Sequence, residues 1–250
     1  QLGYDAAAIA RAYGHPCRAL ALAALTRVAV RWAAGVVAAR EDLPGVARAR
    51  AGRVPVLVQG NGVDPTVFFP CVRPKAGGPF VVAYVGRLEP EKRLDRLIEA
   101  MAGTRARLML VGDGSETWRL RKLAAAFRVT DLDHRPVLPW AEVPDLMRQM
   151  DCFVLPSETE GSSKVLLEAM ATGLPCIASP GAAGPIIEGK TGLVAASVSG
   201  LRDALAAVLG SPLLAQRLGE AARAWVTEHA DIHALLARET AFVRRCLERA

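Results

Sequence analysis

The stretch "CFVLPSETEGSSKVLLEAMATGLPCIAS", from Cys152 to Ser179, contains a complete strand–helix–strand unit. The runs "CFVLPS" and "PCIAS" are short and continuously apolar, which is typical of strands buried on both faces of a parallel sheet. Between them "SKVLLEAMATG" has the spacing of a helix, and Gly173 is suited to close it. The stretch therefore predicts two parallel strands joined by a helix.

The same alternation continues on both sides of this stretch, from Phe80 to about Ala196. Further strand-like runs are "PFVVAYVG", "ARLMLVGDG", "LDHRPVLP" and "GLVAA", and further helical stretches are "EKRLDRLIEAM", "ETWRLRKLAAAFRV" and "AEVPDLMRQM". Buried strands separated by helices predict an α/β fold with a doubly wound, Rossmann-like parallel sheet. Three more helical stretches follow Ala196 without another strand.

We predict four regions along the chain. Residues 1–60 end in "GVVAA" and "VPVLVQG", the tail of an incomplete N-terminal Rossmann-like domain, and residues 61–79 are a linker rich in Pro and Gly. Residues 80–230 form the main domain, and residues 231–250 form a helix that we expect to return to the N-terminal domain. Because the chain begins at Gln1 rather than Met, we also expect further chain upstream.

Composition indicates a folded protein with anionic partners. The chain has 250 residues, of which 52% are apolar, and a net charge of +6. Charge of this sign suits phosphorylated metabolites, anionic membranes or nucleic acid, but aromatic residues make up only 5%, so we predict no nucleic-acid partner. Five scattered cysteines without CxxC spacing argue against a disulfide framework or zinc site and favour a cytoplasmic location.

The most apolar region, residues 19–39, is interrupted by Arg27 and Arg31, so its uncharged runs are too short to span a membrane. A buried helix followed by a strand is the favoured interpretation. The alternative is a basic helix at the membrane surface, with peripheral contact at the inner face.

Three strand ends carry motifs that should converge on one crevice, because ligands of open parallel sheets bind beyond the carboxyl ends of the strands. In "GRLEPEK", Gly86 permits a tight turn, and Arg87 and Lys92 together suit a diphosphate. The alternative is a solvated helix N-terminus. The "VGDG" turn is better explained by close packing, and Asp131 and Asp133 without GxGxxG are poor evidence for a nicotinamide cofactor.

The third motif places two glutamates around a helix start near Ser162 or Ser163. Free N–H groups at such a start favour an anion. Glu168 lies about 7–8 Å further along the axis, roughly the reach from a phosphate to a ribose. Glu160 precedes the helix and would face the group beyond the phosphates. The alternative makes Glu160 an ordinary turn residue and Glu168 an exposed helix position.

Other chemistries lack a pattern in the sequence. The four histidines and the aspartates form no metal-ligand constellation, and no GxSxG nucleophile is present. We therefore predict no metal and no cofactor.

The motifs "NGVD", "VGRLEPEKRLDRLIEAM", "LMLVGDG", "MDCFVLPSETEGSSKVLLEAMATGLPCIAS" and "EGKTGLVA" together resemble the retaining GT-B glycosyltransferases of family four. The similarity runs from about Val54 to the C-terminus, and its most specific feature is the E-x7-E pair of Glu160 and Glu168. The resemblance implies that Arg87 and Lys92 hold the donor diphosphate, that Glu168 binds the ribose and that Glu160 contacts the donor sugar.

The resemblance also implies metal-independent transfer with retention, by attack on the same face as the departing phosphate. The donor would be a UDP-, GDP- or ADP-linked sugar, and the acceptor a glycan or lipid-linked glycan. Additional donor contacts are expected from the main chain of residues 162–165 and from a nucleobase site near residues 137–139. These residues are Ser162, Ser163, Lys164 and Val165, and Val137, Leu138 and Pro139.

Two local departures and the chain length qualify this resemblance. Arg93 stands where a glycine commonly follows the lysine, and Ser162–Lys164 replaces a frequent Phe-Gly-aliphatic run. A whole enzyme has an N-terminal domain with a glycine-rich loop and the acceptor pocket. The sequence therefore predicts a retaining glycosyltransferase or its donor-binding portion. The alternatives are a GT-B-like sugar-nucleotide epimerase and a noncatalytic nucleotide-sugar-binding module.

Overall fold

The computed structural model describes residues 28–30, 32–39, 44–70 and 78–248, which divide into two compact units. The larger unit comprises residues 62–231, and the smaller one comprises residues up to 61 together with 232 onward. The part of the apolar region between residues 19 and 27 lies outside the described residues.

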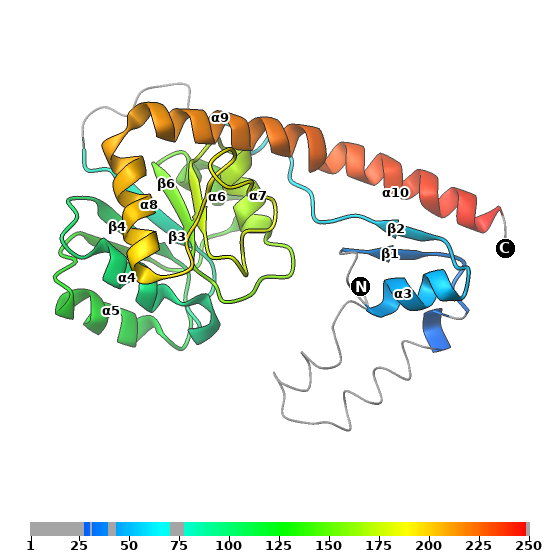
Figure 1. Cartoon of the computed structure of the whole chain (residues 1–250), viewed down its shortest axis with the longest axis horizontal. Helices are drawn as coiled ribbons and strands as arrows, with labels where there is room; N and C mark the ends of the chain where they lie inside the picture. Colours follow the sequence, from blue (N-terminus) through cyan, green and yellow to red (C-terminus); the bar gives the residue numbers. More distant parts are fainter. Residues whose placement is uncertain (1–27, 31, 40–43, 71–77, 249–250) are drawn as a thin grey trace. The chain divides into compact units, whose positions relative to one another are not determined.

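The larger unit is built on a six-stranded sheet (Figure 1). Each strand pairs with its neighbours in parallel, in the order β5-β4-β3-β6-β7-β8. The strands are β3 (Val81–Val85), β4 (Arg107–Val111), β5 (Leu132–Arg135), β6 (Cys152–Leu155), β7 (Cys176–Ala178) and β8 (Leu193–Val194). The predicted doubly wound parallel sheet is confirmed.

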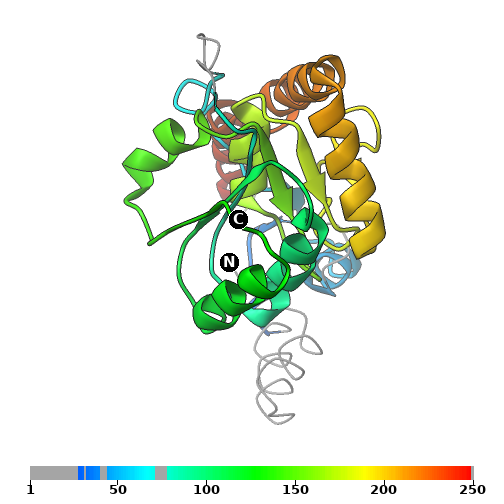
Figure 2. The ribbon, with the colours of Figure 1, turned by 90° about the vertical axis from the view of Figure 1, so that its left-hand side faces the viewer.

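Helices cover both faces of this sheet (Figure 2), which explains why its central strands are continuously apolar. On one face α4 packs between α5 and α8, and on the other α7 packs against α9. The helices are α4 (Leu94–Met101), α5 (Thr117–Ala126), α6 (Val143–Met147), α7 (Lys164–Ala171), α8 (Val198–Gly210) and α9 (Pro212–His229). Short 3-10 turns span Pro90–Lys92 and Trp140–Glu142.

Residues 62–70, which composition assigns to the linker, pack into the larger unit. Phe68 is 1% exposed, and the Arg223 guanidinium donates to its carbonyl oxygen at 3.0 Å. Val63 is also buried, and its N–H donates to the Ala230 carbonyl at 2.9 Å. The prediction of a linker over this half of residues 61–79 is therefore wrong, because two apolar side chains among Pro and Gly residues show no periodicity that would reveal burial. Residues 71–77 lie outside the described residues.

The smaller unit contains a parallel pair of strands, β1 (Val36–Ala38) and β2 (Val56–Val58), joined through α3 (Pro44–Ala51). The C-terminal helix α10 (Ile232–Leu247) packs on this unit. Leu57, Phe242 and Cys246 form its buried cluster, and a Cβ added at Gly35 would lie only 2.6 Å from the Cys246 Sγ. A side chain at that position would therefore push α10 away from β1.

In the described ranges no single helix is long and apolar enough to cross a membrane. Helices α8 and α9 reach the required length and hydropathy only when they are counted together, and the chain bends by 103° between them.

Candidate functional site

Two of the predicted site residues lie where the strand order reverses, between β3 and β6. Such a switch point leaves the loops that follow two adjacent strands free to diverge around a ligand. Here the loop after β3 carries Lys92 and the turn after β6 carries Glu160. The Lys92 Nζ lies 2.7 Å from the Glu160 Oε1, and the two side chains are only 13% and 18% exposed. The structure thus brings together two of the predicted site residues.

The turn that carries Glu160 is fixed by its own backbone and by a buried serine. The Glu160 N–H donates to the Gly181 carbonyl at 2.9 Å, and the Ser157 hydroxyl donates to the Glu160 Oε1 at 2.8 Å. Gly181 has no room for a side chain, since a Cβ there would lie 1.8 Å from the Glu158 carbonyl oxygen. The loops after β6 and β7 therefore hold Glu160 jointly.

Arg93 links the loop after β3 to the same turn. Its guanidinium contacts the Asp95 carboxylate at 3.1 Å and the Glu158 carboxylate at 2.6 Å, and these bonds raise the pKa of Arg93. The Glu158 N–H also donates to the Glu91 carbonyl at 2.9 Å. Arg93 has a φ of 50°, the left-handed conformation that glycine adopts most easily, so its ion pairs hold a non-glycine residue at a glycine-like position.

Arg87 occupies the more exposed end of the loop after β3. Its side chain is 71% exposed and lies 3.3 Å from the Glu91 carboxylate. The backbone of the loop is held from inside, because the buried Tyr84 hydroxyl donates to the Arg87 carbonyl at 2.9 Å. Burial, and then the negative charge of Glu160, raise the pKa of Tyr84. Arg87 is thus available to a ligand from solvent, whereas Lys92 is half-buried beside Glu160.

The glycine-rich turn after β4 packs against the turn after β3. A Cβ at Gly112, whose φ is 132°, would lie 1.9 Å from the Gly86 carbonyl oxygen, and a Cβ at Gly114 would lie 2.3 Å from the Leu88 carbonyl oxygen. Close packing is therefore the observed role of "VGDG". Gly86 contributes the backbone oxygen at the tightest of these approaches.

The start of α7 is the predicted anion-binding element. Ser163 is its N-cap, and the Ser163 Oγ accepts from the Leu166 N–H at 3.4 Å. The N–H groups of Lys164 and Val165 precede the first residue that can find an intrahelical acceptor. Nothing lies within 4 Å of a Cβ added at Gly161, so the approach to this helix end is open there. Ser162 lies between Gly161 and the cap and is half-buried.

Glu168 lies on α7 as a half-buried carboxylate rather than an exposed one. Burial raises its pKa, while the Trp140 indole and the charge of Lys164 act in the opposite direction. The Trp140 Nε1 lies 3.4 Å from the Glu168 Oε1, and the indole meets Phe68 edge-on with 5.9 Å between ring centroids. Because burial disfavours the charged form of Glu168, hydrogen bonds from ligand hydroxyls would stabilise this carboxylate.

The predicted nucleobase region runs directly into Trp140. Val137 is 70% exposed and Trp140 is 59% exposed, while Leu138 between them is half-buried and Pro139 is exposed. This segment joins β5 to the turn before α6, and it puts apolar surface beside Glu168. Sequence reasoning missed Trp140, although it directly follows the predicted segment, and missed Ser157, although it lies three residues before Glu160.

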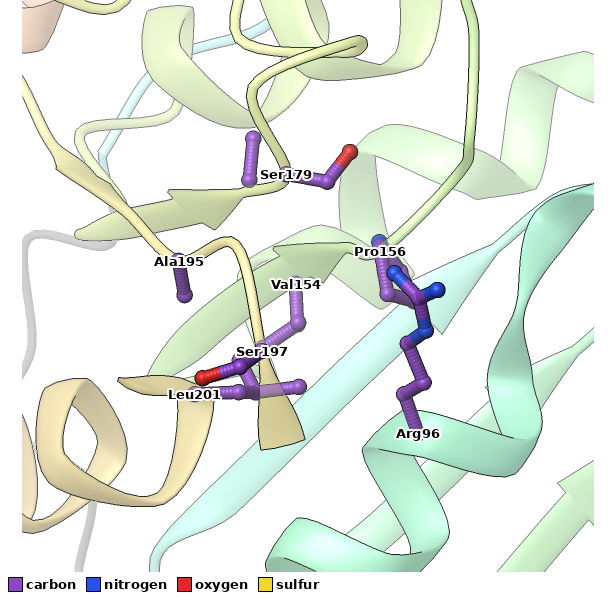
Figure 3. A pocket seen from close by; sticks show the side chains of 8 residues that line it. Arg96, Val154, Pro156, Ser179, Ala195, Ser197 and Leu201 are labelled. Carbon is purple, nitrogen blue, oxygen red and sulfur yellow. The ribbon is translucent and has the colours of Figure 1, made fainter. Parts of the chain in front are cut away.

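A small hollow lies beyond the carboxyl ends of β6, β7 and β8 (Figure 3). Its volume is only about 10 Å³, far below the roughly 300–1,000 Å³ of typical ligand pockets. Arg96 extends from α4 toward Pro156 at its edge (Figure 3). The lining residues are Arg96, Val154, Pro156, Ala178, Ser179, Ala195, Ser197 and Leu201. Since none of the predicted site residues lines it, this hollow is not the predicted donor site.

Over the part of the chain that the structure describes, no group of three or more His, Cys, Asp or Glu side chains is arranged to hold a metal ion. Asp131 pairs with Arg107 and Asp133 pairs with Arg135, each at 2.8 Å. Cys152 is fully buried, and burial raises the pKa of its thiol.

A family model described as glycosyl transferases group 1 matches residues 70–225, which include the whole six-stranded sheet. The chain belongs to the group 1 glycosyl transferases. This assignment confirms the resemblance derived from the motifs.

Two relatives illustrate the similarity of this group 1 chain to known enzymes. A glycogen synthase of Mycobacterium tuberculosis is 35% identical over 197 residues, which cover 72% of this chain and 46% of that protein. A GDP-mannose-dependent alpha-mannosyltransferase of Mycolicibacterium smegmatis is 34% identical over 228 residues, covering 85% of this chain and 57% of that protein. The chain thus spans about half the length of the curated relatives it matches.

Among solved structures, the Anabaena protein HepE in complex with UDP superposes with a TM-score of 0.78. The match covers 91% of this chain and 68% of that protein, at 20% sequence identity. At this identity the likeness shows the fold, and it agrees with the predicted GT-B class.

Proposed function

We propose that this group 1 chain is the donor-binding portion of a retaining glycosyltransferase that takes a hexose from a nucleotide sugar. The observation that carries the proposal is the Lys92–Glu160 pair at 2.7 Å, which spans the switch point of the sheet. A cation and a carboxylate held together there suit a ligand with a diphosphate on one side and sugar hydroxyls on the other.

Each predicted site residue has a role in this proposal. Lys92 and Arg87 neutralise the donor diphosphate, assisted by the N–H groups of Ser163, Lys164 and Val165 at the start of α7. These charges stabilise the diphosphate as it departs, which is where negative charge develops.

Beyond the diphosphate, the two glutamates take different parts of the donor. Glu168 accepts hydrogen bonds from the ribose, and Glu160 accepts them from the transferred sugar. The base lies against the segment around Leu138, Gly86 forms the tight turn that precedes Arg87, and Ser162 contributes to the donor contacts at the start of α7. The departing phosphate accepts the proton of the acceptor hydroxyl on the same face, so configuration is retained.

Calorimetry with UDP, GDP and ADP, with and without EDTA, tests donor binding. We expect at least one of these nucleoside diphosphates to bind in the micromolar to millimolar range, with an affinity that EDTA leaves unchanged. Loss of binding on chelation would contradict metal-independent recognition. If none of the three binds, the proposal of a donor site is wrong.

Incubation with labelled sugar nucleotides distinguishes this function from its alternatives. Slow hydrolysis of the donor supports a transferase, because water then replaces the acceptor. An epimerised sugar would identify an epimerase instead. Binding without turnover, in this chain and in a version extended at its N-terminus, would identify a noncatalytic binding module.

A further inference from the structure

The Glu160 carboxylate receives both of its hydrogen bonds at the same oxygen atom. The Lys92 Nζ lies 2.7 Å from Oε1, and the Ser157 Oγ lies 2.8 Å from Oε1. Within the described ranges, Oε2 has no hydrogen-bonding partner. One oxygen is therefore fixed to the protein while the other is left for a ligand.

Ser157 is itself held rigidly. It is fully buried, and its carbonyl oxygen accepts a hydrogen bond from the Ser179 hydroxyl at the end of β7. The next residue, Glu158, donates its N–H to the loop after β3. A serine hydroxyl carries one proton and a carboxylate only accepts, so the Ser157 proton points to Glu160.

The two donors on Oε1 differ in what a donor substrate would do to them. Lys92 is a flexible ammonium with three protons, and a diphosphate would compete with Glu160 for it. Ser157 is enclosed and has no such competing acceptor on its hydroxyl. Its bond to Oε1 therefore persists when Lys92 turns toward the phosphates, and a carboxylate held in advance loses little entropy on contacting a ligand.

We infer that Ser157 is a positioning residue that fixes Oε1 of Glu160 so that Oε2 faces the transferred sugar. The inference rests on the proposed function for the identity of the ligand. Removing the hydroxyl frees the Glu160 carboxylate to rotate about its side-chain bonds. The substitution should then weaken the binding of the sugar nucleotide and leave the binding of the nucleoside diphosphate nearly unchanged.

The test compares Ser157→Ala with Thr191→Val, which removes another buried hydroxyl. Thr191 is 1% exposed, and its Oγ1 accepts from the Ile187 N–H at 2.7 Å, away from Glu160. Calorimetry measures dissociation constants for UDP against UDP-glucose and for GDP against GDP-mannose. For the pair that the parent binds, we expect Ser157→Ala to weaken the sugar nucleotide about threefold to tenfold and to change the nucleoside diphosphate less than twofold. Thr191→Val should leave the ratio of the two constants unchanged.

A double variant separates positioning from a general structural effect. Ser157→Ala added to Glu160→Gln should weaken the sugar nucleotide no further than Glu160→Gln alone, because the hydroxyl acts through the carboxylate. Equal losses for sugar nucleotide and nucleoside diphosphate, or full additivity in the double variant, would overturn the inference.

Crystal structures of Lys92→Met and of the double variant Ser157→Ala/Lys92→Met give a readout that does not depend on the ligand, because Lys92 no longer holds Oε1 in either protein. We expect the Glu160 carboxylate to keep its position in Lys92→Met and to rotate or adopt more than one conformation in the double variant. An unchanged carboxylate would overturn the inference even if donors bind. By contrast, a parent protein that binds no nucleotide contradicts the proposed function, and the crystal structures still decide the role of Ser157.

Discussion

At the scale of single residues, Glu160 and Glu168 are both half-buried carboxylates, but their surroundings differ. Glu160 is paired with a lysine and a serine at 2.7 and 2.8 Å, whereas Glu168 accepts a longer bond of 3.4 Å from the Trp140 indole, and burial raises the pKa of Glu168. The Glu160 carboxylate is therefore held more firmly than the Glu168 carboxylate.

This difference predicts separate losses when each glutamate is changed. Glu168→Ala should weaken nucleoside-diphosphate binding by about 1–3 kcal/mol, the scale of hydrogen bonds to a charged group. Glu160→Gln should leave that affinity nearly unchanged and reduce donor hydrolysis or transfer. Calorimetry and donor turnover measure the two effects, after circular dichroism and melting show that both variants fold. Equal weakening by both substitutions, or by neither, would contradict the division of roles.

The raised pKa of Glu168 also predicts a pH dependence of stability. Below the pKa of the unfolded chain the carboxyl is protonated in both states. As pH rises, the unfolded chain ionises first, so the free energy of unfolding falls as pH passes through the raised folded pKa. Glu168→Gln should therefore raise the melting temperature by about 1–3 °C at pH 8 and change it little near pH 4. The same difference in melting temperature between parent and variant at both pH values would contradict this prediction.

Trp140 should report on nucleotide binding through its fluorescence. Its indole is 59% exposed beside Glu168, and Trp118, at 67% exposed, lies on α5 and serves as a matched control. We expect the bound nucleoside diphosphate to quench the tryptophan fluorescence of the parent protein. Trp140→Phe should lose most of this quenching and bind up to about tenfold more weakly, since aromatic contacts contribute about 0.5–1.5 kcal/mol. A loss of quenching in Trp118→Phe instead would place the base elsewhere.

At the scale of elements, the junction between the 3-10 turn Pro90–Lys92 and α4 depends on Arg93. This residue has a φ of 50° and is the N-cap of α4, although its side chain makes no capping hydrogen bond to the helix backbone. Ion pairs of the Arg93 guanidinium with Asp95 and with Glu158 stabilise this conformation, and Glu158 lies on the turn after β6. The junction thus couples two elements that form the candidate site.

Two substitutions separate the backbone strain at Arg93 from its ion pairs. Both Arg93→Ala and Arg93→Gly remove the ion pairs, but only glycine adopts the left-handed conformation without cost. We expect Arg93→Gly to be more stable than Arg93→Ala by about 1 kcal/mol, or roughly 2–4 °C in melting temperature. Equal stabilities in thermal melts would show that the backbone relaxes to another conformation at this position.

At the scale of the whole molecule, the net charge of +6 predicts weak attraction to an anionic membrane face. The sequence concentrates arginines in its N-terminal part, namely Arg27, Arg31, Arg40, Arg48, Arg50 and Arg53. Co-sedimentation should show binding to vesicles with anionic lipid that weakens as salt increases. Equal binding to neutral vesicles would exclude an electrostatic origin, and a solvated charged surface would bind neither.

The sequence by itself determined the parallel sheet, its helices and the motifs of the candidate site. Continuous apolar runs such as "VVAYV" and "CFVL" can be buried only in a sheet covered on both faces, and strand ends in such a sheet face one edge. A serine cap at Ser162 or Ser163 followed from the same local chemistry, because capping involves residues three positions apart, and the structure assigns it to Ser163.

Only the tertiary structure decided which of these residues meet. Lys92 and Glu160 are 68 positions apart, and Trp140 and Glu168 are 28 apart, so no local pattern pairs them. The burial of Phe68 and the fixing of Ser157 by Ser179 likewise depend on contacts between distant segments. Spacing along the chain encodes secondary structure and caps, whereas partners of side chains are set by the strand order, which brings β3 and β6 side by side.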